Sequence, residues 1–146
     1  MLEKINHFLA SGFYSGHLPY APGTWGSLLM VLLVFFFPLL NNFYLISALS
    51  IGGIAVANFE EKRTGIKDDK RIVIDEMAGQ LLTFYTLNLN PPVLIGGFIL
   101  FRFFDIVKPW IIDKVQGLPS GWGVMADDLL AGLFSLAILK TVIYFI

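Results

Sequence analysis

The sequence contains no cysteine, only two histidines and few charged residues, and each shortage narrows the function classes. Without cysteine, the chain has no disulfide, no thiolate metal site and no cysteine nucleophile. Two histidines alone argue against a zinc site. Charged residues make up 14 % of the chain, whereas soluble domains contain about 25 %. The net charge of −1 provides no overall basic field that would attract nucleic acid.

Apolar residues fill the chain instead. They account for 56 % of it, and the mean hydropathy is +0.73, which indicates an integral membrane protein. The length of 146 residues predicts one domain covering 1–146. Residues 1–16 lack a long apolar core and a small-residue cleavage site, so we expect no cleavable signal peptide. The sequence leaves the oligomeric state open.

Five apolar runs predict an all-α, polytopic membrane bundle of about five spans. The runs cover residues 22–40, 43–59, 72–89, 93–108 and 126–146. Each is near the short end of the roughly 17–25 residues that cross a bilayer. The first and third runs are also compatible with helices buried inside the bundle or ending short of the far surface. Before them, the helical spacing of Leu2, Ile5, Phe8 and Leu9 predicts a short interfacial helix, with a polar start to the bundle as the alternative.

The charges between the runs predict an orientation. The turns at 41–42 and 88–92 carry no charge, whereas the segments 60–71 and 108–125 carry seven lysines and arginines. The positive-inside rule therefore assigns these two segments to the cytoplasm. With that topology, the first, third and fifth helices begin at the cytoplasmic face and the fourth ends there. The residues gathered at that face are Thr24, Asp75, Glu76, Arg102, Asp105, Lys108, Asp127 and Asp128.

This set of residues suits chemistry on a phosphorylated lipid headgroup. Five of them are carboxylates in one thin layer, where they would repel each other unless a cation bound them. Mg²⁺ prefers such oxygen ligands, often together with substrate phosphate. Free N–H groups at helix starts bind phosphate, and Arg102 and Lys108 can add charge-assisted bonds to it. We therefore predict a Mg²⁺ site with Asp75, Glu76, Asp105, Asp127 and Asp128 as candidate ligands.

Simpler explanations exist for each part of the pattern. Acids in the first turn of a helix are favoured by its dipole without any site. Arg102 and Asp105 are three residues apart, so they can form a pair that only stabilises their helix. A small cation carrier or channel is the alternative function, because membrane-embedded acids also line ion pathways. A carrier would need charges near the bilayer centre and on both sides, whereas these lie at one surface.

Several motifs, in order along nearly the whole chain, resemble one family. They are GFYSG at 12–16, PGTWGSL at 22–28, IVIDE at 72–76 with Gly79, FR at 101–102 with Asp105 and KPW at 108–110, and GWGVMADD at 121–128 followed by AG at 131–132. In these motifs the chain resembles phosphatidylglycerophosphatase A, a Mg²⁺-dependent lipid phosphatase of the bacterial inner membrane. The resemblance implies hydrolysis of phosphatidylglycerophosphate to phosphatidylglycerol and phosphate. The segment 68–71 is more charged than the family pattern, which leaves open whether Lys70 and Arg71 contact the phosphate.

The hypothesis for the mechanism combines the resemblance with the residues. Mg²⁺ held by some of the five carboxylates would polarise the phosphate and lower the pKa of an attacking water. Glu76 is our first choice for the base that accepts the water's proton. Arg102 and Lys108 would offset phosphate charge, and the helix start at Gly23 and Thr24 would hold an oxygen. An aspartyl-phosphate intermediate remains the alternative to direct attack by water.

Overall fold

The computed structural model describes residues 1–146 and contains helices without strands, which confirms the all-α prediction. The elements are α1 (Leu2–Ala10), η1 (Ser15–His17), α2 (Pro22–Phe36), η2 (Pro38–Leu40), α3 (Phe43–Thr64), α4 (Ile74–Thr83), α5 (Pro91–Val107), α6 (Ile111–Gln116) and α7 (Gly121–Phe145). The two elements marked η are single turns of 3₁₀-helix.

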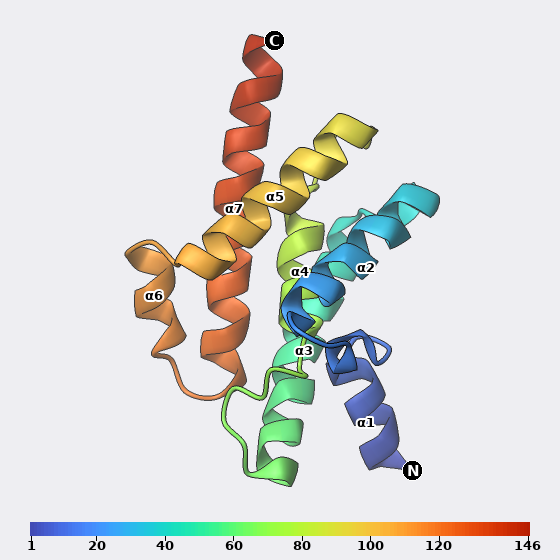
Figure 1. The fold of residues 1–146 in the computed structure, drawn as a ribbon, viewed down its shortest axis with the longest axis vertical. Helices are drawn as coiled ribbons and strands as arrows, with labels where there is room; N and C mark the ends of the chain where they lie inside the picture. Colours follow the sequence, from blue (N-terminus) through green and yellow to red (C-terminus); the bar gives the residue numbers. More distant parts are fainter.

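The short helix α4 is the centre of the bundle. It packs against α7, α2, α3 and α5 (Figure 1). One end of the molecule holds the C-terminus of α7, the start of α5 and the end of α2, while α1, the end of α3 and the start of α7 lie at the opposite end (Figure 1). The central position of α4 means that residues on all its faces contact other helices, which explains why eight of its ten residues are buried.

Polar caps and prolines set where the helices begin. Asn42 Oδ1 accepts the N–H of Leu45 at the start of α3, and Asn90 Oδ1 accepts that of Val93 at the start of α5. Pro22 and Pro91 occupy the first turns of α2 and α5, where a missing N–H costs nothing. The predicted turns at 41–42 and 88–92 therefore coincide with real helix boundaries.

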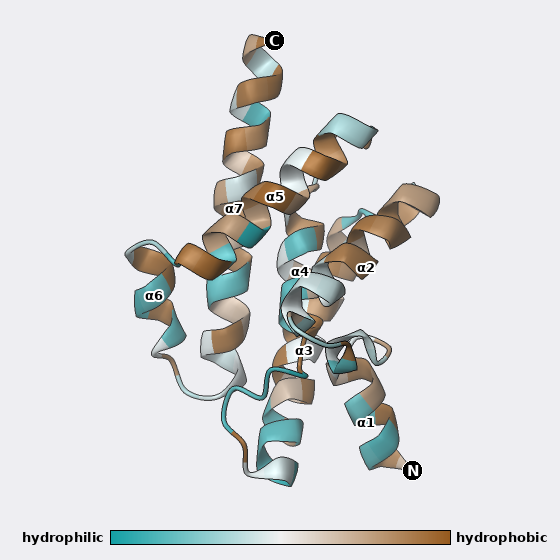
Figure 2. Cartoon of the chain, in the orientation of Figure 1, coloured by the Kyte–Doolittle hydropathy of each residue, from teal (hydrophilic) through white to brown (hydrophobic).

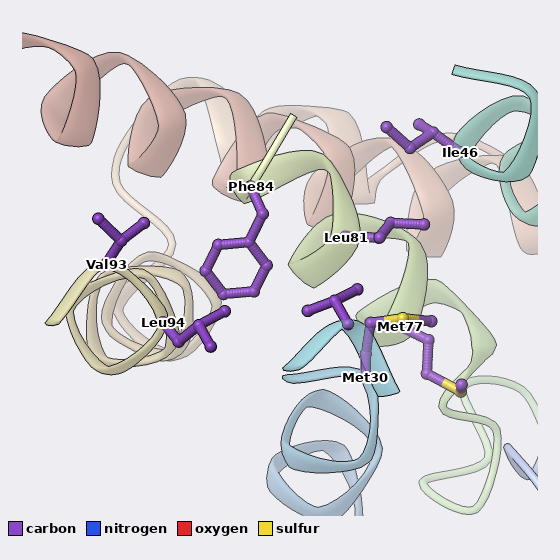
Figure 3. Packing of buried hydrophobic residues seen from close by; sticks show 8 residues of the cluster. Met30, Ile46, Met77, Leu81, Phe84, Val93 and Leu94 are labelled. Carbon is purple, nitrogen blue, oxygen red and sulfur yellow. The ribbon is translucent and has the colours of Figure 1, made fainter. Parts of the chain in front are cut away.

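The main hydrophobic core lies around the second half of α4. It consists of Met30, Val34, Ile46, Met77, Leu81, Phe84, Val93 and Leu94. Figure 3 shows Phe84, the residue that follows α4, beside Leu94 of α5, and Leu81 of α4 near Met77 and Met30. Each large apolar side chain that is fully buried stabilises the fold by about 1.5–3 kcal/mol. The apolar half of α4 thus anchors the helix, and its first half is left to carry acids.

Two helices, α3 with 22 residues and α7 with 25, are long and apolar enough to cross a membrane. The other three predicted spans are shorter: α2 has 15 residues, α4 has 10 and α5 has 17. At 1.5 Å per residue, α4 rises only about 15 Å, half of the hydrocarbon thickness. The five-span arrangement is therefore not confirmed. Figure 2 shows apolar residues dominating the upper parts of α2, α5 and α7.

Two helix boundaries differ from the prediction. Helix α3 continues past residue 59 to Thr64, where Gly65 ends it in a left-handed conformation with φ 70°. Helix α7 begins at Gly121 rather than at 126, because Asn58 Oδ1 of α3 accepts the N–H of Gly121 at 2.7 Å. Asp127 and Asp128 consequently lie beyond the first turn of α7, and the prediction that they occupy a helix N-terminus is wrong.

Candidate active site

A polar pocket of about 270 Å³ opens where α4, α5, α6 and α7 meet the 65–73 segment. Its lining residues are Asp68, Asp69, Lys70, Ile72, Asp75, Glu76, Asp105, Lys108, Gln116, Val124, Asp127 and Asp128. The five predicted metal ligands and Lys108, the six residues predicted to take part in catalysis, are all among them. The structure therefore brings together side chains that are up to 53 positions apart in the sequence, from Asp75 to Asp128.

Close contact between two helix backbones aligns the central acids. A Cβ atom on Gly79 of α4 would collide with the main-chain oxygen of Asp128, and one on Gly132 of α7 would collide with that of Gly79. Small residues of this kind let helices approach each other unusually closely. Asp75 and Asp128 each precede one of these glycines by four residues, about one helical turn. The glycine contact thus brings the two carboxylates together.

Asp75, Glu76 and Asp128 form the tightest group of acids. Each offers a carboxylate oxygen within 4.8 Å of the others. Asp75 Oδ1, Glu76 Oε2 and Asp128 Oδ1 are buried and have no hydrogen-bond partner. Burial raises the pKa of Asp75 and of Glu76 above the ordinary values, since water no longer stabilises their charges. Three carboxylates that each keep a buried oxygen without a partner fit a hard divalent cation, and they supply the oxygen donors expected for Mg²⁺.

The other two predicted acids already have cationic partners. Asp105 is paired with Arg102, three residues earlier on α5. Asp127 accepts a hydrogen bond of 2.5 Å from Lys108 Nζ. Burial opposes the charge of Lys108, but the bond to Asp127 outweighs it and raises the pKa of Lys108. The other oxygen of Asp127, Oδ1, is buried and has no partner. The cationic partners nevertheless make Asp105 and Asp127 less available as metal ligands than the group of three.

Glycine at position 23 lets α2 approach the site. A Cβ atom there would collide with Glu76 Oε1 and would lie 3.2 Å from Arg102 Nη1. Helix α2 therefore contributes a backbone wall beside Glu76 and Arg102. Thr24, the next residue, does not line the pocket. Of the predicted substrate contacts, Gly23 and Arg102 lie against Glu76, and Lys108 lines the pocket itself.

Sequence reasoning missed two buried polar residues on the same helices. Ser27 of α2 and Gln80 of α4 are fully buried, and neither the Ser27 hydroxyl nor either polar atom of the Gln80 amide has a partner. Gln80 follows Glu76 by four residues, so both lie on one face of α4. In the sequence, each appears only as a polar residue within an apolar run, and such a residue alone does not indicate a functional site.

The 68–71 segment contributes more to the pocket than the sequence indicated. The sequence left open whether this segment contacts the substrate, and Asp68, Asp69 and Lys70 line the pocket. Arg71 hydrogen-bonds both oxygens of Asp69 and thereby holds the pKa of Asp69 below its ordinary value. This pair fixes the loop over the pocket. Gln116 of α6 reaches the pocket as well, and nothing in its local sequence marks it.

Comparisons with known proteins agree with this site. A family model described as Phosphatidylglycerophosphatase A matches residues 8–143. The chain is 35 % identical to a Phosphatidylglycerophosphatase A of Haemophilus influenzae, over 98 % of this chain and 94 % of the relative. It is 37 % identical to the Escherichia coli protein of that name, over 91 % and 80 % respectively.

A further relative carries a different name. The chain is 38 % identical, over 87 % of its length and 86 % of the relative, to a Bacteroides thetaiotaomicron protein to which phosphatidylinositol-3-phosphatase activity is attributed. No solved structure matches the chain. The family match covers nearly the whole chain and includes every acid of the pocket. The chain therefore belongs to the phosphatidylglycerophosphatase A family.

Proposed function

We propose that this protein hydrolyses the phosphomonoester of phosphatidylglycerophosphate, giving phosphatidylglycerol and inorganic phosphate. Membership of the family and the names of two relatives support this reaction. The observation that carries the proposal is the group of Asp75, Glu76 and Asp128, whose carboxylates each keep a buried oxygen without a partner, in a site that also holds two cationic side chains, Arg102 and Lys108. Such a group binds a divalent cation on one side and phosphate oxygens on the other.

Asp75 and Asp128 would hold Mg²⁺, with Glu76 at the edge of the same group. Their unpaired oxygens and their all-oxygen chemistry support this assignment. When bound, Mg²⁺ polarises phosphoryl oxygens and promotes ionisation of a nearby water. Asp105 and Asp127 would hold Arg102 and Lys108 in place rather than bind the metal. The five ligands predicted from the sequence thus reduce to Asp75 and Asp128 in this proposal, and Glu76 remains the candidate base.

The remaining residues supply the proton transfer and charge balance. A water attacks phosphorus in line with the bond to the glycerol oxygen, and Glu76 accepts its proton. The bond between phosphorus and that oxygen then breaks, and the proton passes from Glu76 to the leaving oxygen. Arg102 and Lys108 neutralise charge that develops on the phosphoryl group. Direct attack is favoured over an aspartyl-phosphate because Asp75 and Asp128 serve as ligands.

The active site would face the cytoplasm. The basic residues at the end of α3, in the following loop and around α6 support this, since positive charge accumulates on the cytoplasmic side. The two long apolar helices fit a membrane-associated protein, and the named relatives are bacterial. Lys70, Lys108 and Gln116, which belong to these basic segments, line the polar pocket. A cation carrier would need acids on both sides of the bilayer, and here they share one pocket.

The test is phosphate release in detergent micelles from three lipids, each with Mg²⁺ and with EDTA. The lipids are phosphatidylglycerophosphate, phosphatidic acid and phosphatidylinositol 3-phosphate, the last because of the Bacteroides relative. We expect Mg²⁺-dependent release that is fastest with the first lipid. Preference for the inositol lipid would reassign the substrate and keep the chemistry. No release from any lipid by folded, metal-supplemented protein would contradict the proposal.

A further inference from the structure

A second pocket, lined by apolar side chains, lies at the junction of α5, α6 and α7. It has a volume of about 220 Å³ and is lined by Phe104, Pro109, Trp110, Ile111 and Phe134. Phe104 and Phe134 form its aromatic side, with ring centroids 5.8 Å apart. No charged residue lines it. The pocket is open to the outside of the molecule, and its walls offer only apolar contacts.

This pocket adjoins the polar pocket along the backbone. Phe104 lines the apolar pocket and the next residue, Asp105, lines the polar one. Lys108 lines the polar pocket, and the residue that follows, Pro109, lines the apolar one. Consecutive residues at both positions therefore divide the two environments, and the end of α5 forms their common wall. A molecule with a charged head and an apolar tail can occupy both at once.

The backbone after α5 has an unusual conformation that leaves the Trp110 side chain exposed. Lys108 and Trp110 both have positive φ angles, 47° and 29°. Such a conformation is rare for a bulky residue and is unfavourable. The result is a Trp110 side chain that is 88 % exposed at the edge of the apolar pocket. The unusual backbone conformation is therefore associated with an indole that lies beside the pocket and is not buried.

We propose that this apolar pocket binds a segment of one acyl chain of the substrate lipid while the phosphate occupies the polar pocket. The inference rests on the proposed phosphatase function. An apolar cavity of about 150 Å³ accommodates benzene, so the volume here suits a few methylenes rather than a whole chain. Trp110 and Ile111 act as specificity residues: they contact the chain and help to retain the lipid, and they take no part in the chemical step.

The test compares chain lengths at a fixed headgroup. Synthetic phosphatidylglycerophosphates with dibutyryl or dioctanoyl chains are supplied as dilute components of the same detergent micelles with Mg²⁺. We expect Trp110→Ala combined with Ile111→Ala to lower kcat/KM for the dioctanoyl lipid by about tenfold, through KM, since removing apolar contacts to a few methylenes costs about 10–200-fold. With the dibutyryl lipid the loss should shrink to about twofold, because its chains are too short to fill the pocket.

The matched control is Leu49→Ala, which shortens a side chain in a different apolar pocket, between α2 and α3. It should leave the dependence on chain length as in the unmodified protein. An equal loss with both lipids, or no loss with either, would overturn the inference while phosphate release by the unmodified protein upholds the proposed function. No release of phosphate by the unmodified protein from either lipid would instead overturn the proposed function itself.

A direct binding measurement separates chain contact from effects on the fold. In a Trp25→Phe, Trp122→Phe background, Trp110 is the sole tryptophan. A dioctanoyl substrate analogue brominated along its chains should quench the fluorescence of Trp110, and unbrominated substrate lipid should reverse the quenching. Quenching that phosphatidylcholine reverses equally well would mean that Trp110 contacts any lipid, and it would overturn the inference.

Discussion

Two groups of acidic residues in this protein have opposite surroundings. Glu60, near the end of α3, is completely buried, and both of its oxygens are bonded. Its Oε1 accepts from His7 Nδ1 at 2.6 Å and is paired with Arg63, and its Oε2 accepts from Asn6 at 3.1 Å. His7 in turn shares a hydrogen bond of 2.7 Å with His17. This group fastens α1 and η1 to α3.

In the group of Asp75, Glu76 and Asp128, the first and last residues are buried and Glu76 is half-buried, but the group lacks such partners. Each of its three carboxylates keeps at least one buried oxygen without a hydrogen bond. An unpaired buried polar group destabilises a protein, by roughly 1–3 kcal/mol and by more when it is charged. The difference separates a structural role from a functional one: Glu60 has partners supplied by the fold, whereas the acids of the pocket have oxygens left for a ligand.

Replacement of an acid in the pocket should give the largest effect on activity. We expect Asp128→Asn to lower phosphate release by more than about 100-fold, since even residues behind metal ligands typically contribute about 10–100-fold. The thermal midpoint should not fall, because one of several mutually repelling acids is removed. Mg²⁺ should raise the midpoint of the unmodified protein and not that of the variant. The control is Asp113→Asn on the exposed side of α6; full activity of Asp128→Asn would refute the site.

The opposite pattern is expected for Glu60→Gln. An amide cannot accept hydrogen bonds at both positions, so the charge-assisted bonds from His7 and Asn6 are weakened. We expect a loss of about 2 kcal/mol in the free energy of unfolding, in the range of such bonds. Phosphate release per folded molecule should change less than about twofold, roughly 0.4 kcal/mol in the barrier. A large loss of activity without a loss of stability would contradict the structural role of Glu60.

Contact between α4 and α7 should matter for both stability and activity. Gly132→Ala inserts a methyl group against the main-chain oxygen of Gly79 and separates Asp75 from Asp128. We expect a destabilisation of about 1–3 kcal/mol, typical of overpacking, together with reduced activity and weaker Mg²⁺ binding. Gly52→Ala is the matched control, because a Cβ at Gly52 meets no atom within 4 Å. Similar behaviour of the two variants in thermal unfolding and Mg²⁺ titration would exclude the glycine contact as the alignment device.

The smallest effect is expected for His17→Ala. It removes a single bond to His7 Nε2 and leaves Glu60 with its partners on α1 and α3. A neutral hydrogen bond contributes about 0.5–1.5 kcal/mol, and we expect a loss at the lower end because this one is exposed. Activity should stay unchanged in the micelle assay. A loss of phosphate release comparable to that of Asp128→Asn would show that the histidines take part in the reaction.

Much of the organisation could be predicted from local patterns. The apolar runs predicted helices, and Asn-Asn at 41–42 and Asn-Pro-Pro at 90–92 marked their boundaries because amides cap helices and proline suits the first turn. Charge distribution and the family motifs singled out the acids that line the pocket. These features depend on residues close together in the chain, which is why the sequence reveals them.

The lengths of the helices depended on contacts that no local pattern shows. Helix α7 begins five residues earlier than its apolar run because Asn58 of α3 caps Gly121. Helix α3 continues through Glu60 because His7 and Asn6 of α1 bond that carboxylate. The prediction of five spans failed to be confirmed for a related reason: a buried α4 needs only ten apolar-rich residues, whereas a lipid-exposed span needs about twenty.

The sequence by itself determined the helical class, the approximate boundaries, the acidic residue types and the family. Only the tertiary structure decided which acids remain unpaired, because that depends on where Arg102, Lys108, His7 and Asn6 lie in space. Carboxylates look alike in a sequence, and burial and hydrogen bonding distinguish them. The structure therefore distinguishes Glu60, whose two oxygens are bonded within the fold, from Asp75, Glu76 and Asp128, which each keep a buried oxygen without a hydrogen-bond partner.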